Sequence, residues 1–137
     1  MTTDAGDAEA LVERYLALFA AGEIEAAARL LTPDAVLVFP GGTPQTSLPD
    51  VAAEVDRLYE KVAKRIDRTW TATTPDGLVV TTTGHLYGTS RTAGDFDDVR
   101  FIDFFTIRDG RIAAQEVIND AAAVGVVPPY RRTAADF

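Results

Sequence analysis

The sequence contains no cysteine, one histidine and two serines among its 137 residues. Without cysteine there can be no disulfide, thiolate zinc site, iron–sulfur cluster or cysteine nucleophile. The single histidine, His85, excludes zinc sites that need two or three imidazoles from one chain. Ser47 and Ser90 lie in no nucleophile elbow, Walker loop or Rossmann glycine fingerprint, which argues against serine hydrolysis, phosphoryl transfer and hydride transfer. Carboxylates, phenols and one imidazole remain for catalysis, and no metal or organic cofactor is implied.

Basic residues are also scarce, because 13 Lys and Arg face 21 Asp and Glu and leave a net charge of −8. Such a field repels phosphate backbones and anionic lipid headgroups, so we expect neither nucleic acid nor membrane as a partner. The amino end, MTTDAGDAEA, lacks the basic and apolar stretches of a signal peptide, and no apolar run approaches the ~18 residues of a membrane span. We expect a cytoplasmic protein.

The length predicts a single domain over residues 1–137. A hydrophobic content of 47% supplies enough apolar material for one core. Segment 126–137 has two prolines and no periodicity, so we expect either a mobile tail or an arm that contacts a second subunit.

Helical periodicity is confined to the first half of the chain. Apolar residues recur at spacings of three and four over 7–21, where Gly22 supplies a terminator. A second helix is predicted over 23–31, and a third follows the Ser47 cap and spans 51–65. Its expected solvent face carries Glu60, Lys61, Lys64 and Arg65.

The rest of the chain is rich in β-branched and aromatic residues. Strands are predicted over 35–40, 68–74, 78–88, 99–107 and 111–120. Helices followed by hairpin-connected strands indicate the α+β class, with the helices gathered on one face of a curved antiparallel sheet.

One acidic residue interrupts an apolar stripe. In the strand VRFIDFFTI, alternation places Asp103 between Phe101 and Phe105 on one face. A buried carboxylate must pair, accept several hydrogen bonds or stay protonated, and each option is useful in a pocket. The alternative is a purely structural Asp103, which anchors a loop or pairs with Arg100 or Arg68.

Three further side chains are candidates for chemistry. Tyr15 lies on the apolar stripe of the first helix, where a buried phenol seeks a hydrogen-bond partner. His85 shares a mixed strand face with threonines and Tyr87 and is either a functional imidazole or a solvated one. Asp120 closes the last strand and is either catalytic or the cap of the short segment 121–125.

Three segments carry a family resemblance, namely ERYLALFAAGEIEAAARLLTPDAVLVFPGG, GHLYG and FIDFFTIRDGRIAAQEVIND. Through them the chain resembles the nuclear transport factor 2-like superfamily and, within it, the SnoaL-like and ketosteroid isomerase-like branch. The resemblance implies a cone, in which a curved mixed sheet and three N-terminal helices enclose a hydrophobic cavity, and commonly a homodimer. It implies no single activity, since the same cone hosts isomerases, dehydratases, cyclases, epoxide hydrolases and binding domains.

By this resemblance Tyr15 and Asp103 correspond to the oxyanion donors of ketosteroid isomerase-like members, in which an apolar site keeps the acid neutral. Phe39 stands where those enzymes carry their proton-shuttling aspartate, so the resemblance leaves the base to another residue, with His85, Asp120 and Asp103 as the candidates. Alternatively an ionised Asp103 orients His85, and Tyr15 remains the hydrogen-bond donor. The implied pocket residues are Phe39, Trp70, Phe101, Phe105, Tyr87 and Asn119.

The leading hypothesis is therefore an enzyme that moves a proton next to a carbonyl of an apolar ring compound, polyketide- or terpenoid-like, with isomerisation, cyclisation or dehydration as the outcome. The alternative is a non-catalytic domain that binds a hydrophobic small molecule or serves as a dimerising scaffold. Epoxide hydrolysis ranks lower, because alternation places Arg100 and Asp103 on opposite faces of one strand.

Overall fold

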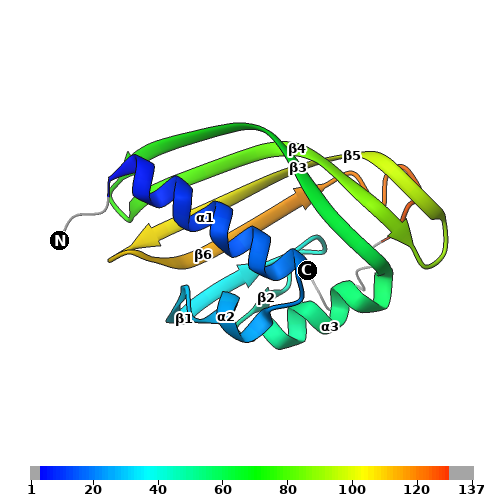
Figure 1. Cartoon of the computed structure of the whole chain (residues 1–137), viewed down its shortest axis with the longest axis horizontal. Helices are drawn as coiled ribbons and strands as arrows, with labels where there is room; N and C mark the ends of the chain where they lie inside the picture. The colour runs from blue at the N-terminus through cyan, green and yellow to red at the C-terminus, as the bar shows by residue number, and fades with distance from the viewer. Residues whose placement is uncertain (1–3, 130–137) are drawn as a thin grey trace, which may run out of the picture.

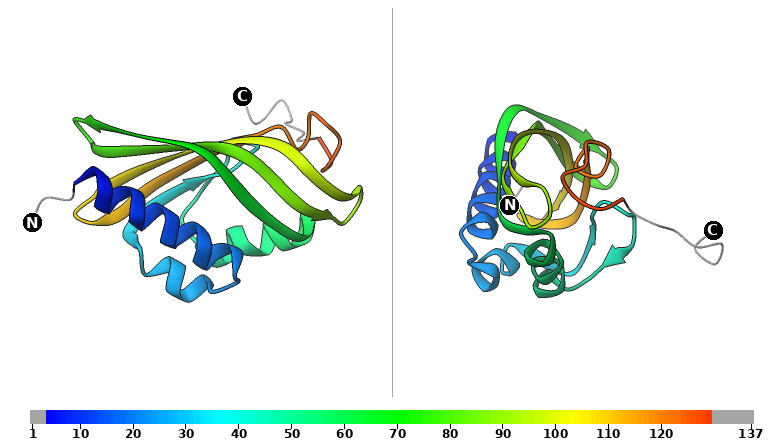
Figure 2. Two further views of the ribbon diagram at one scale, coloured as in Figure 1. Left: turned by 45° about the horizontal axis from the view of Figure 1, so that its top comes forward. Right: turned by 90° about the vertical axis from the view of Figure 1, so that its right-hand side faces the viewer.

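A single six-stranded sheet, in the order β2-β1-β6-β5-β4-β3, curls around three helices (Figures 1 and 2). The computed structural model describes residues 4–129. The elements are α1 (Ala5–Ala20), α2 (Ile24–Ala28), β1 (Leu31–Val38), β2 (Pro44–Gln45), α3 (Leu48–Leu58), β3 (Tyr59–Thr74), β4 (Gly77–Ser90), β5 (Gly94–Arg108) and β6 (Arg111–Asn119). Neighbouring strands are antiparallel except for β1 and β6, which run parallel. The predicted α+β class with a curved mixed sheet is confirmed.

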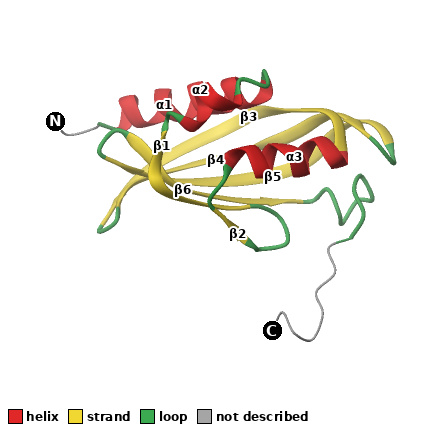
Figure 3. Cartoon of the chain, turned by 90° about the horizontal axis from the view of Figure 1, so that it is seen from below, coloured by secondary structure: helices red, strands yellow, loops and turns green. Residues whose placement is uncertain are grey.

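The helices lie on one side of the sheet (Figure 3), which we call the inner side, and the opposite side is the outer face. Asp4 caps α1 by accepting a hydrogen bond from the Asp7 amide at 2.8 Å, and the positive φ of Gly22 (78°) ends the turn that follows the helix, as predicted. The predicted cap of α3 is also present, because the Ser47 hydroxyl accepts from the Asp50 amide at 3.3 Å. None of the helices within residues 4–129 is long and apolar enough to cross a membrane.

The third helix spans Leu48–Leu58 and so ends seven residues before the predicted end at residue 65. The chain turns extended at Tyr59 and pairs with β4 along almost the whole length of β3. Charged residues at helical spacing favoured a helix locally, but pairing with a 14-residue neighbouring strand outweighs that weak preference. The consequence is large for Lys64, which faces Leu86 across the ladder instead of lying on a solvated helix surface.

Strand β5 confirms the alternation read from the sequence. Val99, Phe101, Asp103, Phe105 and Ile107 are all buried, and the residues between them are more exposed. Two apolar clusters fill the inner side, one built around Tyr15 and Phe105 and the other around Phe101. The site described below lies where these clusters meet.

The second cluster includes Val126 and Val127, which are 8% and 3% exposed. The predicted tail over 126–137 therefore begins with two core residues, since the chain after β6 folds back over that end of the sheet. Residues 130–137 lie outside the described part of the chain.

Candidate functional site

A pocket of about 1070 Å³ lies between α1, the loop after β1, α3 and the inner face of the sheet. Its size suits a ring compound of drug-like dimensions. Its apolar wall includes Phe19, Phe39, Val55, Val62, Leu86 and Val117. The polar side chains in its lining include Tyr15, Lys64, Gln115 and Asn119. A mostly apolar hollow with a few inward polar groups is the usual form of a small-molecule site.

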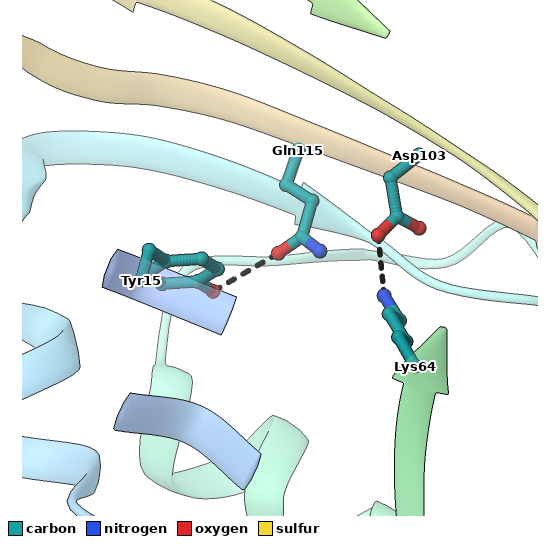
Figure 4. Close-up of polar contacts among 4 residues, drawn as sticks. All are labelled: Tyr15, Lys64, Asp103 and Gln115. Carbon is teal, nitrogen blue, oxygen red and sulfur yellow. Dashed lines mark hydrogen bonds and ion pairs between the residues drawn. The ribbon is translucent and has the colours of Figure 1, made fainter. Parts of the chain in front are cut away.

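The first polar pair joins α1 to β6. The hydroxyl of Tyr15, which is 1% exposed, donates a hydrogen bond to Oε1 of Gln115 at 2.9 Å (Figure 4). Burial and, to a smaller extent, the negative charge of Asp103 raise the pKa of Tyr15 above its ordinary value. The phenol therefore stays protonated and holds the amide of Gln115 in a fixed orientation.

The second pair joins β3 to β5. The Lys64 ammonium donates a hydrogen bond to Oδ2 of Asp103 (Figure 4). It also lies 5.0 Å from the centroid of the Phe101 ring. The Lys64 side chain is 20% exposed, whereas that of Asp103 is 0% exposed. Among residues 4–129, no group hydrogen-bonds the second carboxylate oxygen, Oδ1.

Two opposing effects act on the Asp103 carboxyl. Burial raises its pKa, because a charged carboxylate is poorly solvated in an apolar interior, and the charge and hydrogen bond of Lys64 lower it. Burial is the larger effect. The ammonium of Lys64 therefore offsets only part of the cost of burying an ionised Asp103.

Lys64 lies between the pocket and the carboxyl group, since Lys64 lines the pocket and Asp103 does not. The amide nitrogen of Gln115 points away from Tyr15, to the side on which the Lys64–Asp103 pair lies (Figure 4). The wall thereby presents two kinds of N–H donor, a primary amide and an ammonium. Such an arrangement can bind a carbonyl oxygen and stabilise negative charge that develops on it.

Several predicted site residues gather here. Tyr15, Phe39, Tyr87 and Asn119 line the pocket. The rings of Phe101 and Phe105 lie behind the wall, where Phe101 contacts Lys64, and Phe105 packs edge-on against Tyr15 at a centroid distance of 5.9 Å.

The structure separates His85 from this group. On β4, Gly84 and Leu86 take the buried positions, so His85 points to the outer face, where its Nδ1 lies 2.8 Å from Oδ2 of Asp67. Trp70, half exposed on β3, is likewise outside the pocket lining. The expected positions of His85 and Trp70 at the pocket are therefore wrong. Alternation along a strand shows which residues share a face, but the sequence did not show which face of the sheet was the inner one.

Asp120 is also absent from the pocket lining, although its neighbour Asn119 is part of it. Its carboxylate accepts a hydrogen bond from Nε of Arg100 at 2.6 Å on the exposed side of the sheet. The side-chain cap of the following turn is supplied by Asn119, whose Oδ1 accepts from the Ala121 amide at 3.0 Å.

Two residues of the site, Lys64 and Gln115, were not predicted from the sequence. For Gln115 a signal existed, since it alternates with Ala113 and Val117 on a predicted strand, the same pattern that identified Asp103. For Lys64 none existed once its segment had been interpreted as helix. Within residues 4–129, no three His, Asp or Glu side chains gather in a way that could hold a metal ion.

The sequence profile of the SnoaL-like domain matches residues 12–115, most of the chain and nearly all of the pocket wall. The chain belongs to the SnoaL-like family. No match was found among curated proteins.

Solved structures agree on the fold. A nuclear transport factor 2-like protein of unknown function from Burkholderia pseudomallei superposes with a TM-score of 0.73 at 15% identity, over 90% of this chain and 98% of that one. TerC, co-crystallised with polyporic acid, gives 0.72 at 20% identity, over 88% and 96%. A proposed SnoaL-like polyketide cyclase from Jannaschia gives 0.71 at 16% identity, over 94% and 99%. At these identities the similarity shows the fold alone.

Proposed function

We propose that the protein is a small enzyme that transfers protons on an apolar ring compound carrying a carbonyl or hydroxyl group. The observation that carries this proposal is the Lys64–Asp103 pair, a cation on the wall of an apolar pocket with a fully buried carboxyl directly behind it. A surface ion pair would be solvated and inert, whereas this one couples two titrating groups to the pocket. Isomerisation, cyclisation and dehydration are the outcomes that such a site supports.

Lys64 is the group that exchanges protons with the substrate. Its bonded proton passes to the carboxylate of Asp103, which leaves an amine facing the pocket. That amine removes a proton from the carbon next to the substrate carbonyl, so a C–H bond breaks, an N–H bond forms and the electron pair moves onto the carbonyl oxygen. The site then holds an enolate, an ammonium and a neutral acid, and its total charge is unchanged.

Gln115 and Tyr15 act on the oxygen that gains charge. The Gln115 amide N–H groups donate to it, and the hydroxyl of Tyr15 keeps that amide turned toward the ligand by bonding its carbonyl. The enolate can then take a proton from the Lys64 ammonium at another carbon, attack a second carbonyl whose oxygen takes that proton, or expel a hydroxyl group that leaves as water with that proton. In each case the proton held by Asp103 returns to Lys64 and restores the starting pair.

The names of similar structures support a ring compound as substrate. TerC was co-crystallised with polyporic acid, and structures from Jannaschia, Pseudomonas putida and Xanthomonas campestris are described as proposed polyketide cyclases. A polyketide-like aromatic or alicyclic compound fits the apolar wall of this pocket.

The proposal is tested without knowledge of the substrate by deuterium exchange. We expect the protein in D₂O to accelerate exchange of the α-protons of a bicyclic ketone such as 2-tetralone, with saturation kinetics followed by NMR. Lys64→Met should lower the rate about 10²–10⁴-fold, and His85→Ala, on the outer face, is the control with an unchanged rate. Saturable binding without exchange, over a panel of cyclic ketones, would support the alternative of a non-catalytic binding domain.

We also propose a homodimer formed through the outer face. Large apolar side chains exposed on β3, β5 and β6 include Trp70, Ile102, Phe104 and Ile118, with exposed fractions of 37–54%. Ile102 pairs directly with Ile118 on the neighbouring strand, and exposed apolar side chains that lie together commonly mark a protein interface. Analytical ultracentrifugation should show a dimer, and Phe104→Glu should shift it to monomer, whereas Arg108→Glu, on the same strand, should not.

A further inference from the structure

Resting on the proposed function, we infer that the pocket selects ring compounds with an acidic hydroxyl, enols or phenols, and holds them as anions against Lys64 while Asp103 carries the proton. The step that follows is an exchange of counter-ions. Lys64 is paired with Asp103 before the ligand arrives and with the ligand oxygen afterwards.

Most charges on the chain and around the pocket repel anions, and only a local positive charge attracts them. The whole chain carries −8, and two carboxylates, Glu13 and Glu54, lie along the pocket. Of the two basic residues in the lining, Arg57 is bonded to Glu54 at 2.9 Å, with two thirds of its side chain exposed. Lys64 is therefore the cation available inside, and a neutral acid enters this pocket more readily than an anion.

The buried carboxyl decides what happens next. An anionic ligand and an ionised Asp103 would place two negative charges on one ammonium in an apolar interior, which is unfavourable. The conflict ends when Asp103 takes a proton. Its Oδ1 has no hydrogen-bond partner among residues 4–129, so the interior offers the ionised form only one donor, Lys64.

The exchange balances without any further reactant. The O–H bond of the ligand breaks and its proton joins Lys64, while the proton that Lys64 shares with Asp103 forms an O–H bond on that carboxyl. Lys64 keeps three N–H bonds throughout. The ligand becomes an anion, Asp103 becomes neutral, and the charge of the complex equals that of the separate neutral ligand and protein.

The structure of the site predicts that the protein distinguishes a hydroxyl compound from its methyl ether. A methyl ether of the same ring system has the same apolar surface but no proton to give, so it leaves Asp103 ionised and gains no ion pair with Lys64. We expect the hydroxyl compound to bind at least about tenfold more tightly, which corresponds to 1.4 kcal/mol.

The test uses 2-hydroxy-1,4-naphthoquinone, whose absorbance distinguishes its neutral and anionic forms, with 2-methoxy-1,4-naphthoquinone as the matched control. Titration of the full chain should give a bound spectrum of the anion. At a pH where the free ligand is already ionised, each binding event should take up one proton. The affinity should therefore fall about tenfold for each unit by which the pH rises. Calorimetry in two buffers of different ionisation enthalpy measures that uptake directly.

Variants separate the two members of the pair. Asp103→Asn should still bind the anion but without proton uptake, so its affinity should no longer depend on pH. Lys64→Met should lose the preference for the hydroxyl compound, and His85→Ala should behave as the wild type. A bound spectrum of the neutral form, equal affinity for the methyl ether, or pH-independent binding to the wild type would each overturn the inference.

Failure here is distinguishable from failure of the proposed function. Exchange of 2-tetralone protons with no selectivity for the acidic hydroxyl would leave a proton-transfer enzyme without this ligand class. Selective anion binding with proton uptake, but no exchange, would leave the ligand class and remove the enzyme.

Discussion

Two pairs of a nitrogen-bearing side chain and a carboxylate lie on opposite faces of the same sheet, and they differ in burial. On the inner side, Lys64 and Asp103 have side chains that are 20% and 0% exposed. On the outer face, His85 and Asp67 are 33% and 43% exposed, although their atoms also approach within hydrogen-bond distance, 2.8 Å. Water screens the outer pair and solvates each member alone, so neither group depends on the other.

The comparison shows that residue type is a poor guide to chemistry in this fold. The histidine is the residue with the more familiar catalytic character, yet it lies on the solvated side. The lysine and the aspartate, packed against an aromatic ring at the pocket wall, are the pair on which the proposed proton transfer rests. Strand alternation decides which side chains face the inner side of the sheet, and in our proposal only those side chains take part in the chemistry.

The largest expected difference is in turnover. Asp103→Asn removes the proposed proton acceptor behind Lys64 and should lower α-proton exchange about 10²–10⁴-fold. Asp67→Asn makes the same chemical change on the outer face and should leave the rate within about twofold of the wild type. Equal losses in the two variants, measured by NMR at matched protein concentration, would contradict the assignment of the site.

The second largest difference between the two pairs should be in the free energy of unfolding. Lys64→Met leaves a fully buried carboxylate without its cation and should cost about 3 kcal/mol in urea denaturation. The double variant Lys64→Met and Asp103→Leu removes both charges and should recover most of that loss while remaining inactive. The outer-face variant His85→Ala should change stability by less than about 1 kcal/mol.

The pH dependence of stability follows from the raised pKa of Asp103. A carboxyl with a folded pKa above its unfolded value holds its proton more tightly when folded, so its contribution is complete below the unfolded pKa and is lost as pH rises through the folded pKa. The unfolding free energy of the wild type, minus that of Asp103→Asn, should therefore fall as pH rises from about 4. An increase over that range would show that Lys64 outweighs burial.

The sequence predicted the fold well, because its information is periodic. Alternation around Asp103 placed the acid inside, the Ser47 cap began α3, and the paired hairpins predicted the sheet. These features depend on residues close together in the chain. Residue 65, by contrast, was placed at the end of a helix that in fact stops at Leu58, since β3 is fixed by pairing with a strand that comes later.

The site was predictable only in part, for the same reason. Tyr15 and Asp103 could be found one element at a time, each as a polar residue on an apolar stripe. Their partners, Gln115 and Lys64, lie 100 and 39 residues away along the chain. No local sequence pattern specifies which distant side chain forms the hydrogen bond. The face taken by His85 depended on the register of β4, which only the three-dimensional pairing settles.

The smallest effect is expected at Thr82, which directly opposes Asp103 on the neighbouring strand. It is 1% exposed, and its hydroxyl has no hydrogen-bond partner among residues 4–129. A buried hydroxyl without a partner contributes nothing to set against its desolvation, so the isosteric Thr82→Val should keep or slightly raise the unfolding free energy, within about 0.5 kcal/mol. Thr81→Val, one position away on the outer face, is the control. A loss above about 1 kcal/mol at Thr82 alone would show that its hydroxyl supports the Asp103 carboxyl in the folded protein, and the inner pair would then extend to a third residue.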